Sequence, residues 1–157
     1  MKLFRQEQEQ LIFEFSGREK SLLLAILNLF PLVPLAHHQL SRDATLPDAE
    51  LNQQLLEASL KSQKTDQQKW LATLLAKPDC LKPVKSNFHF TVTRSDLEGL
   101  LQVLNDVRVG SWLALGSPNL AQEKKLILDA ATAVQVHRME LAGLFQMFFL
   151  NAINEVE

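Results

Sequence analysis

The sequence is poor in the residues that mark several large classes of protein. It has one cysteine, no tyrosine, five glycines and six prolines among 157 residues. A single cysteine cannot form an internal disulfide framework, which favours a reducing compartment, so we expect a cytoplasmic protein. The low glycine and proline content argues against a turn-rich all-β fold and against a glycine-rich nucleotide-binding fold.

The sequence also lacks the features of nucleic-acid-binding and membrane proteins. Its formal net charge is −2, whereas proteins that bind nucleic acid or anionic membranes usually carry a basic excess. The most apolar stretch, residues 22–36, is short and is interrupted by Asn28, Pro31 and Pro34, so it cannot span a bilayer. The first ten residues are polar and acidic, whereas a signal peptide begins with basic residues. We therefore expect a soluble protein that binds neither nucleic acid nor membranes.

The residues that are present predict one mainly helical domain over residues 1–157. Hydrophobic residues make up 46% of the chain and charged residues 22%, which is typical of a folded domain and not of a disordered chain. Helical periodicity and start or stop signals predict helices over residues 17–30, 48–76, 96–115 and 118–156. Ser16 with Glu19 and Ser95 with Glu98 match the capping box that opens a helix. Residues 62–66 are polar on every side, so we expect a break there.

Two short segments alternate apolar and polar residues, which predicts two β-strands. They are residues 10–15 and residues 87–93. The apolar positions are Leu11, Phe13 and Phe15 in the first segment and Phe88, Phe90 and Val92 in the second. Two short strands in an otherwise helical chain most simply pair with each other, so we expect an antiparallel ribbon.

The last predicted helix is the most apolar one, and the fold is expected to be organised around it. Its apolar residues cover about half of the helix circumference at 100° per residue. They are Val134, Leu141, Leu144, Phe145, Phe148, Phe149, Ala152 and Ile153. The expected fold is thus mainly α, with about five helices packed around an apolar C-terminal helix and a two-stranded antiparallel β ribbon.

Arg108 has an unexpected position in the pattern of the helix over residues 96–115. On a helical wheel it falls in the middle of the apolar stripe, with Trp112 one turn beyond and Asn105 at the edge, while Asp106 points away. The stripe consists of Leu97, Leu101, Leu104, Ser111 and Leu115. A buried guanidinium needs an acceptor, because an uncompensated buried charge is costly. We therefore expect Arg108 to be buried beside a carboxylate or an anion.

Arg138 and His137 fall inside the apolar arc of the last helix in the same way. Two interpretations stay open. In the first, Arg108 forms an internal ion pair with Glu14, Glu19 or an acid of residues 48–76, and stacks on Trp112. In the second, Arg108, Arg138 and His137, with Trp112 and Asn105, bind a small anion.

The sequence contains no motif that points to catalysis. We find no metal-ligand spacing and no phosphate-binding loop, so no metal or cofactor is expected. Cys80 lies in a linker without a helix N-terminus to lower its pKa, which is typical of an inert thiol. Beside the arginines, only His137 offers a general base. These observations favour a protein that is not an enzyme.

Residues 100–116, Leu-Leu-Gln-Val-Leu-Asn-Asp-Val-Arg-Val-Gly-Ser-Trp-Leu-Ala-Leu-Gly, resemble the L-N-D-x-R-L…L-G helix of an uncharacterised bacterial family of small, mainly helical cytoplasmic proteins. The match is carried by Leu104, Asn105, Asp106, Arg108, Leu113 or Leu115, and Gly116. It covers about a third of the chain, and the following segment lacks that family's aromatic-rich, acidic start to the last helix. Some members are thought to be encoded beside an adaptor of the Clp protease. The resemblance implies a regulatory or interaction role and no chemistry.

Met139, Met147 and Leu150 fall on the side of the last helix opposite its core arc, among neutral polar residues. An apolar strip with a polar rim is typical of a contact surface, and an isologous homodimer is the commonest way to bury one. The alternative is that residues 48–76 cover it. A helix over residues 118–156 would be about 55–60 Å long, longer than a domain of this size. We therefore expect it to break near Gly143 or Asp129, or to overhang onto a second subunit.

These patterns lead to two hypotheses about function. The first is a non-enzymatic cytoplasmic interaction or regulatory protein that self-associates, with a further protein partner. The second is a binding protein or enzyme for a small anionic ligand at Arg108, Arg138 and His137.

Overall fold

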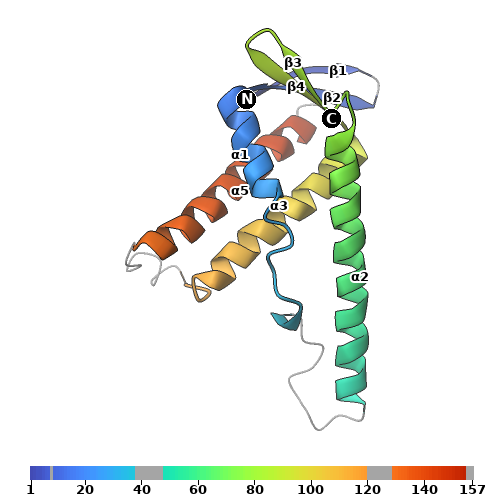
Figure 1. Ribbon diagram of the computed structural model, residues 1–157, viewed down its shortest axis with the longest axis vertical. Helices are drawn as coiled ribbons and strands as arrows, with labels where there is room; N and C mark the ends of the chain where they lie inside the picture. Colours follow the sequence, from blue (N-terminus) through green and yellow to red (C-terminus); the bar gives the residue numbers. More distant parts are fainter. Residues whose placement is uncertain (8, 38–47, 120–128, 155–157) are drawn as a thin grey trace.

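The fold is mainly helical, as expected, with a single antiparallel sheet at one end of the molecule (Figure 1). The computed structural model describes residues 1–7, 9–37, 48–119 and 129–154. Its elements are β1 (Lys2–Glu7), β2 (Gln10–Ser16), α1 (Gly17–Leu27), the 3-10 helix η1 (Leu35–His37), α2 (Ala49–Ala76), β3 (Leu81–Val84), β4 (Asn87–Thr93), α3 (Arg94–Ala114) and α5 (Ala130–Asn154). No helix in these ranges is long and apolar enough to cross a membrane.

The sheet has four strands in the order β1-β2-β4-β3, and every neighbouring pair is antiparallel. The predicted pairing of the two central strands is confirmed, with Phe13 opposite Phe90 and Phe15 opposite Phe88. The prediction of a two-stranded ribbon was wrong, because β1 and β3 extend it at the edges. Both edge strands are mostly exposed, and β3 contains Pro83. Polar residues and proline are typical of edge strands and hide the alternation that marks a strand in sequence.

The aromatic face of the sheet packs on α5, and α1 lies on the same side of the sheet (Figure 1). Phe13 is fully buried, and its ring centroid lies 5.3 Å from that of Phe149 and 5.4 Å from that of Phe148. Phe15 and Phe90 are also fully buried. Each of these side chains contributes about 1.5–3 kcal/mol by leaving water. The inner, aromatic side of α5 is therefore fixed by the sheet.

Of the two predicted capping boxes, one is confirmed and one was wrong. Ser16 Oγ accepts from Glu19 N–H at 3.3 Å, and Glu19 Oε2 accepts from Ser16 N–H at 2.8 Å. The second helix, α3, is capped by Thr93 and Asp96 and not by Ser95. Strand β4 runs directly into α3, so the helix begins two residues earlier than the capping box in the sequence suggests.

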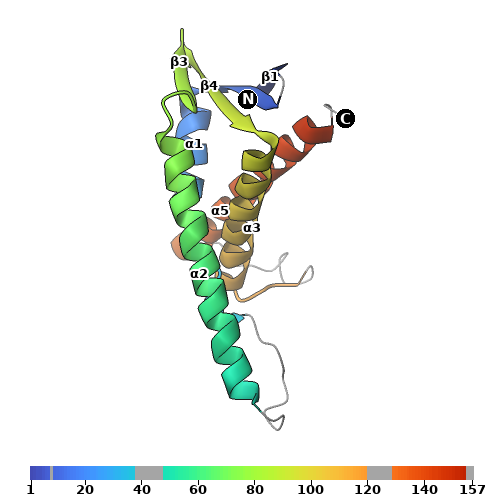
Figure 2. The ribbon, with the colours of Figure 1, turned by 90° about the vertical axis from the view of Figure 1, so that its right-hand side faces the viewer.

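Helix α2 is continuous from Ala49 to Ala76, so the break expected at residues 62–66 was wrong. Lys64 in the middle of this run pairs with Asp106 of α3 at 2.8 Å, and its side chain is only 14% exposed. This contact with α3 supports the helix where its own sequence is polar. In the views of Figures 1 and 2, the N-terminal end of α2 extends beyond the other helices. Leu51 and Leu55 in that half are 54% and 60% exposed, whereas Leu71 and Leu74 near the other end are buried.

Helix α5 begins at Ala130, directly after Asp129. Asp129 Oδ1 accepts from the N–H groups of Ala131 and Thr132 at 3.0 and 2.8 Å, and these bonds complete the first helical turn. The expected break near Asp129 is confirmed, while Gly143 lies inside the helix. A helix start at Pro118 was wrong, because residues 117–119 have no regular structure. The rest of the predicted helix, residues 120–128 and 155–157, lies outside the described residues.

Candidate functional site

A groove lies between α3 and the outer side of α5, and we call it the α3–α5 groove. Its lining residues are Asn105, Arg108, Val109 and Trp112 from α3, and Met139, Glu140, Gly143, Gln146, Met147, Leu150, Asn151 and Asn154 from α5. All three predicted self-association residues are here, together with three of the five predicted anion-binding residues. The α3–α5 groove therefore combines the predicted self-association strip with part of the predicted anion site.

The apolar part of the α3–α5 groove is open. Met147 is 60% exposed and Leu150 is 48% exposed, while Met139 is half-buried. Helix α2, the element that was expected to cover this strip if it were not an interface, contributes no residue to the lining. Contiguous exposed apolar side chains with a polar rim are typical of contact surfaces.

Arg108 is exposed, so the prediction that it is buried was wrong. The buried residues of α3 include Leu100, Val103 and Val107, which places the core-facing side of this helix about 60° away from the predicted stripe. Arg108 instead extends over the surface of α5. A Cβ atom built on Gly143 would lie 3.9 Å from Cδ and Nε of Arg108, so the side chain lies close to the backbone of α5.

Trp112 and Asn105 have simpler roles in the groove than predicted. The Trp112 indole N–H donates to the carbonyl oxygen of Pro118 at 3.2 Å, which ties the end of α3 to the following chain. In the described part of the chain, the cation–π pairs are Arg5 with Phe4 and Lys20 with Phe88, so the predicted stack of Arg108 on Trp112 is not formed. Asn105 is exposed at the rim.

Arg138 and His137 line a different groove, between α1 and α5, which we call the α1–α5 groove. Its other lining residues are Leu22, Ala25, Ile26, Leu29, Ala133, Val134 and Leu141. Val134, expected in the core, is 47% exposed there. On a helical wheel Arg138 and His137 lie about 120–140° away from Gly143. The structure thus divides the five predicted anion-binding residues between two grooves on two sides of α5.

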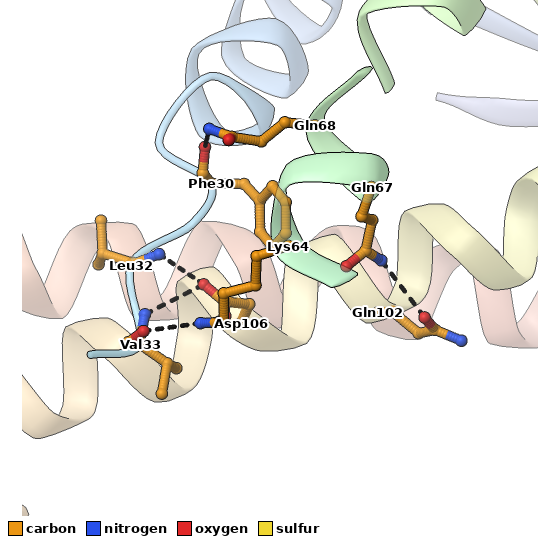
Figure 3. Close-up of polar contacts among 8 residues, drawn as sticks. All are labelled: Phe30, Leu32, Val33, Lys64, Gln67, Gln68, Gln102 and Asp106. Atoms are coloured by element: carbon orange, nitrogen blue, oxygen red, sulfur yellow. Dashed lines mark hydrogen bonds and ion pairs between the residues drawn. The ribbon is translucent and has the colours of Figure 1, made fainter. Parts of the chain in front are cut away.

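The sequence reasoning missed a polar junction on the other side of α3, centred on Asp106. Asp106 Oδ1 accepts from the N–H groups of Leu32 and Val33, the latter at 3.1 Å. Its Oδ2 pairs with Lys64 Nζ at 2.8 Å, and Lys64 Nζ also donates to the Val33 carbonyl at 2.6 Å (Figure 3). The Lys64 and Asp106 side chains are only 14% and 12% exposed. We call these four residues the Asp106 junction.

Two glycines bring other elements close to α3 beside this junction. A Cβ atom on Gly110 would lie 2.6 Å from Leu32 Cβ and 2.8 Å from its backbone carbon. A Cβ atom on Gly99 would lie 2.5 Å from the Trp70 ring. A side chain at Gly110 would therefore have to displace the backbone of Leu32, whereas one at Gly99 would have to displace the Trp70 ring. Gly99, Asp106 and Gly110 recur at helical spacing, and this signal in the sequence could have revealed a second contact face of α3.

Two further possibilities are a reactive Cys80 and a metal site. Cys80 is buried, and burial, with a further contribution from the Asp96 carboxylate, raises its pKa to about 11. Among the residues that the structure describes, no three His, Cys, Asp or Glu side chains are grouped so that they could hold a metal ion.

No family model, curated protein or solved structure matches this chain. The resemblance of residues 100–116 to a bacterial family therefore stays a prediction, and a function has to be argued from the grooves and the junction themselves.

Proposed function

We propose that this chain is a non-enzymatic interaction or regulatory protein that self-associates through the α3–α5 groove. One observation carries the proposal: Met147 and Leu150 are 60% and 48% exposed within the groove, beside Met139. Removing such side chains from water is the main driving force of protein association. Methionine also adapts its shape to an opposing surface.

The rival hypothesis, a small-anion site, is less well supported by the placement of its residues. Such a site needs Arg108, Arg138 and His137 to converge on one ligand, and they line two different grooves. Arg108 lies instead beside the exposed methionine strip, where arginine is common in protein interfaces. We therefore favour a second protein chain as the occupant of the groove.

The proposal is tested by sedimentation velocity at tens of micromolar. We expect the wild type to be a dimer and Met147→Glu with Leu150→Glu to be a folded monomer, because two carboxylates would be buried in the interface. Leu51→Glu with Leu55→Glu is the matched control. It places two glutamates at leucines of α2 that are similarly exposed, at 54% and 60%, and it should leave the dimer intact.

A wild type that is monomeric at these concentrations ends the self-association proposal. A dimer that survives in the α5 variant but is lost in the α2 variant would place the interface on α2 and contradict the choice of the groove. Far-ultraviolet circular dichroism and a thermal melt of each variant confirm that the monomers are folded.

A further inference from the structure

The α1–α5 groove is a second open surface, and its walls are almost entirely apolar. The wall from α1 and the turn after it consists of apolar residues at the i, i+3, i+4 and i+7 spacing of one helical face. They are Leu22, Ala25, Ile26 and Leu29. Val134 and Leu141 belong to the wall from α5, and Val134 is 47% exposed. An exposed apolar surface of this kind is typical of a binding site for another molecule.

The groove is about as long as two turns of a helix. Helix α1 crosses α5, and the N-terminal half of α5 extends beyond the crossing (Figure 1). The groove residues of α5 lie in that half, between Ala133 and Leu141. At a rise of 1.5 Å per residue, the two walls are about 10–12 Å long.

The groove carries positive charge that the fold does not neutralise. Among its described lining residues, Arg138 and His137 are the ones that can be charged, and none is acidic. Arg138 is half-buried and forms no ion pair in the described part of the chain. The nearest acid along α5, Glu140, lines the α3–α5 groove. A guanidinium stays charged at every physiological pH, so the groove suits an occupant that brings an anion.

The exposure of the groove decides between a small molecule and a protein segment. Small-molecule sites usually bury most of the surface of their ligand. Here Ala25, Ala133 and His137 are exposed, so a fatty acid with its carboxylate at Arg138 would leave much of its chain in water. An amphipathic helix instead buries its apolar face and keeps its polar face in water. Recognition of a helix in a groove uses apolar anchors at i, i+3, i+4 and i+7.

We propose that the α1–α5 groove binds an acidic amphipathic helix of a partner protein. The apolar anchors of the partner pack between the two walls, and an Asp or Glu beside these anchors pairs with Arg138. The ring of His137 offers a further hydrogen-bond donor to such a carboxylate. The inference does not rest on self-association, because the α3–α5 groove lies on another side of α5.

A displayed library of helical peptides of about 15 residues, which is long enough to form a helix, tests the proposal. The library is first depleted on the full-length Val134→Glu variant and is then selected on the wild type. Both proteins have the α3–α5 groove, so the depletion removes peptides that bind there. We expect the selected peptides to carry apolar residues at i, i+3 or i+4, and i+7, with Asp or Glu beside them.

Two variants with a new carboxylate on α5 show where a selected peptide binds. Val134→Glu places a negative charge in the groove, so fluorescence anisotropy of the labelled peptide should show binding at least about tenfold weaker than to the wild type. Leu144→Glu is the matched control, because Leu144 is 46% exposed on the same helix and lines neither groove. It should bind the peptide as the wild type does.

An exchange of charges tests the role of Arg138. The selected peptide should bind Arg138→Glu at least about tenfold more weakly than it binds the wild type. A version of the peptide with lysine in place of its acids should bind Arg138→Glu more tightly than the wild type. Recovery of binding with the lysine peptide also shows that Arg138→Glu is folded.

Several outcomes would overturn the inference. They are a library without any binder that depends on Val134, selected peptides without an excess of acids, and a charge exchange that restores no binding. Dodecanoate that binds the wild type when no library peptide does would assign the groove to a fatty acid. Sedimentation velocity separates the inference from the proposed function. A monomeric wild type that binds the peptide overturns self-association alone, whereas a dimer that binds no peptide overturns this inference alone.

Discussion

The charged residues on the two sides of α3 differ in burial and in pairing. On one side, Asp106 is largely buried and accepts hydrogen bonds from Leu32, Val33 and Lys64. On the other side, Arg108 is exposed and has no ion-pair partner among the described residues. A buried and fully bonded charge fixes the position of neighbouring elements, whereas an exposed and unpaired one is free to interact with another molecule. The first side therefore belongs to the fold and the second to the proposed interface.

Glycines show the same contrast between the two sides. Gly110 is in close contact with Leu32, whose Cβ would lie 2.6 Å from a Cβ atom built on the glycine. At Gly143, in the open groove, the nearest atoms to such a Cβ atom are 3.9 Å away and belong to the Arg108 side chain. Glycine is required by packing at the first position and not at the second. Substitutions on the two sides should thus change stability in different directions.

The largest effect is expected on the closed side, from Asp106→Ala. This change leaves the Lys64 ammonium and two backbone N–H groups without their acceptor. Breaking a buried ion pair by removing one partner costs about 3–5 kcal/mol, and we expect a loss of that size in the free energy of unfolding. The measurement is urea-induced unfolding followed by circular dichroism.

Two further variants sharpen this result. Asp106→Asn keeps an oxygen for the two backbone N–H groups and should lose less stability than the alanine variant. Gln102→Ala removes an exposed α3 side chain that also contacts α2, through Gln67 at 3.3 Å, and should change stability by less than about 0.5 kcal/mol. Equal losses in Asp106→Ala and Gln102→Ala would contradict the distinction between the closed side and an ordinary surface contact.

How well the sequence predicted each part of the fold follows from the number of surfaces that each element buries. Strands β2 and β4 and their antiparallel pairing were predicted, because each segment alternates apolar and polar residues. Strand β1 was missed, because it is an exposed edge strand with few apolar residues. Helix α3 packs on two surfaces at once, and a helical wheel with a single apolar stripe cannot represent that.

The second effect in size is expected from Gly110→Ala, also on the closed side. The added methyl group would lie 2.6 Å from Leu32 Cβ and 2.8 Å from its backbone carbon, so the chain around Leu32 has to move. Overpacking of this kind costs about 1–3 kcal/mol, which exceeds the gain of about 0.5–1 kcal/mol from replacing a helical glycine by alanine. Urea unfolding should show a net loss, and a gain would show that the contact is easily relieved.

The third effect is smaller and opposite in sign. Gly143→Ala on the open side meets only the flexible Arg108 side chain, at an ordinary contact distance of 3.9 Å. We expect a stabilisation of about 0.5–1 kcal/mol, because alanine favours the helix. The substitution is measured in the monomeric Met147→Glu, Leu150→Glu background, so that dimerisation does not enter the free energy of unfolding. A loss of stability there would show that the groove is more tightly packed than this distance indicates.

The candidate site was predicted only in part, again for a physical reason. Met139, Met147 and Leu150 were correctly placed together, because the spacing along one helix determines which residues share a face. Arg108 lies beside this strip and Arg138 does not. This difference depends on how α1, α3 and α5 pack together, and the residue pattern of one helix does not contain that information. The helical wheel of α3 also placed Asp106 away from the core. The partners that bury it come from α2 and from residues 32 and 33, and the pattern of α3 alone cannot reveal them.

The smallest effect on stability is expected from Arg108→Met, which removes the exposed charge and keeps most of the side-chain volume. Since Arg108 has no ion-pair partner among the described residues, the free energy of unfolding of the monomeric background should change by less than about 0.5 kcal/mol. Dimerisation of the otherwise wild-type chain should weaken, because a cation of the proposed interface is lost. Arg138→Met, in the α1–α5 groove, should leave dimerisation unchanged.

The same pair of variants tests the anion-site hypothesis, because a ligand that binds only the folded state raises the melting temperature. A rise in melting temperature on adding phosphate that is present in the wild type and lost in both variants would show that the two arginines share an anion, against the arrangement in which Arg108 faces a second protomer.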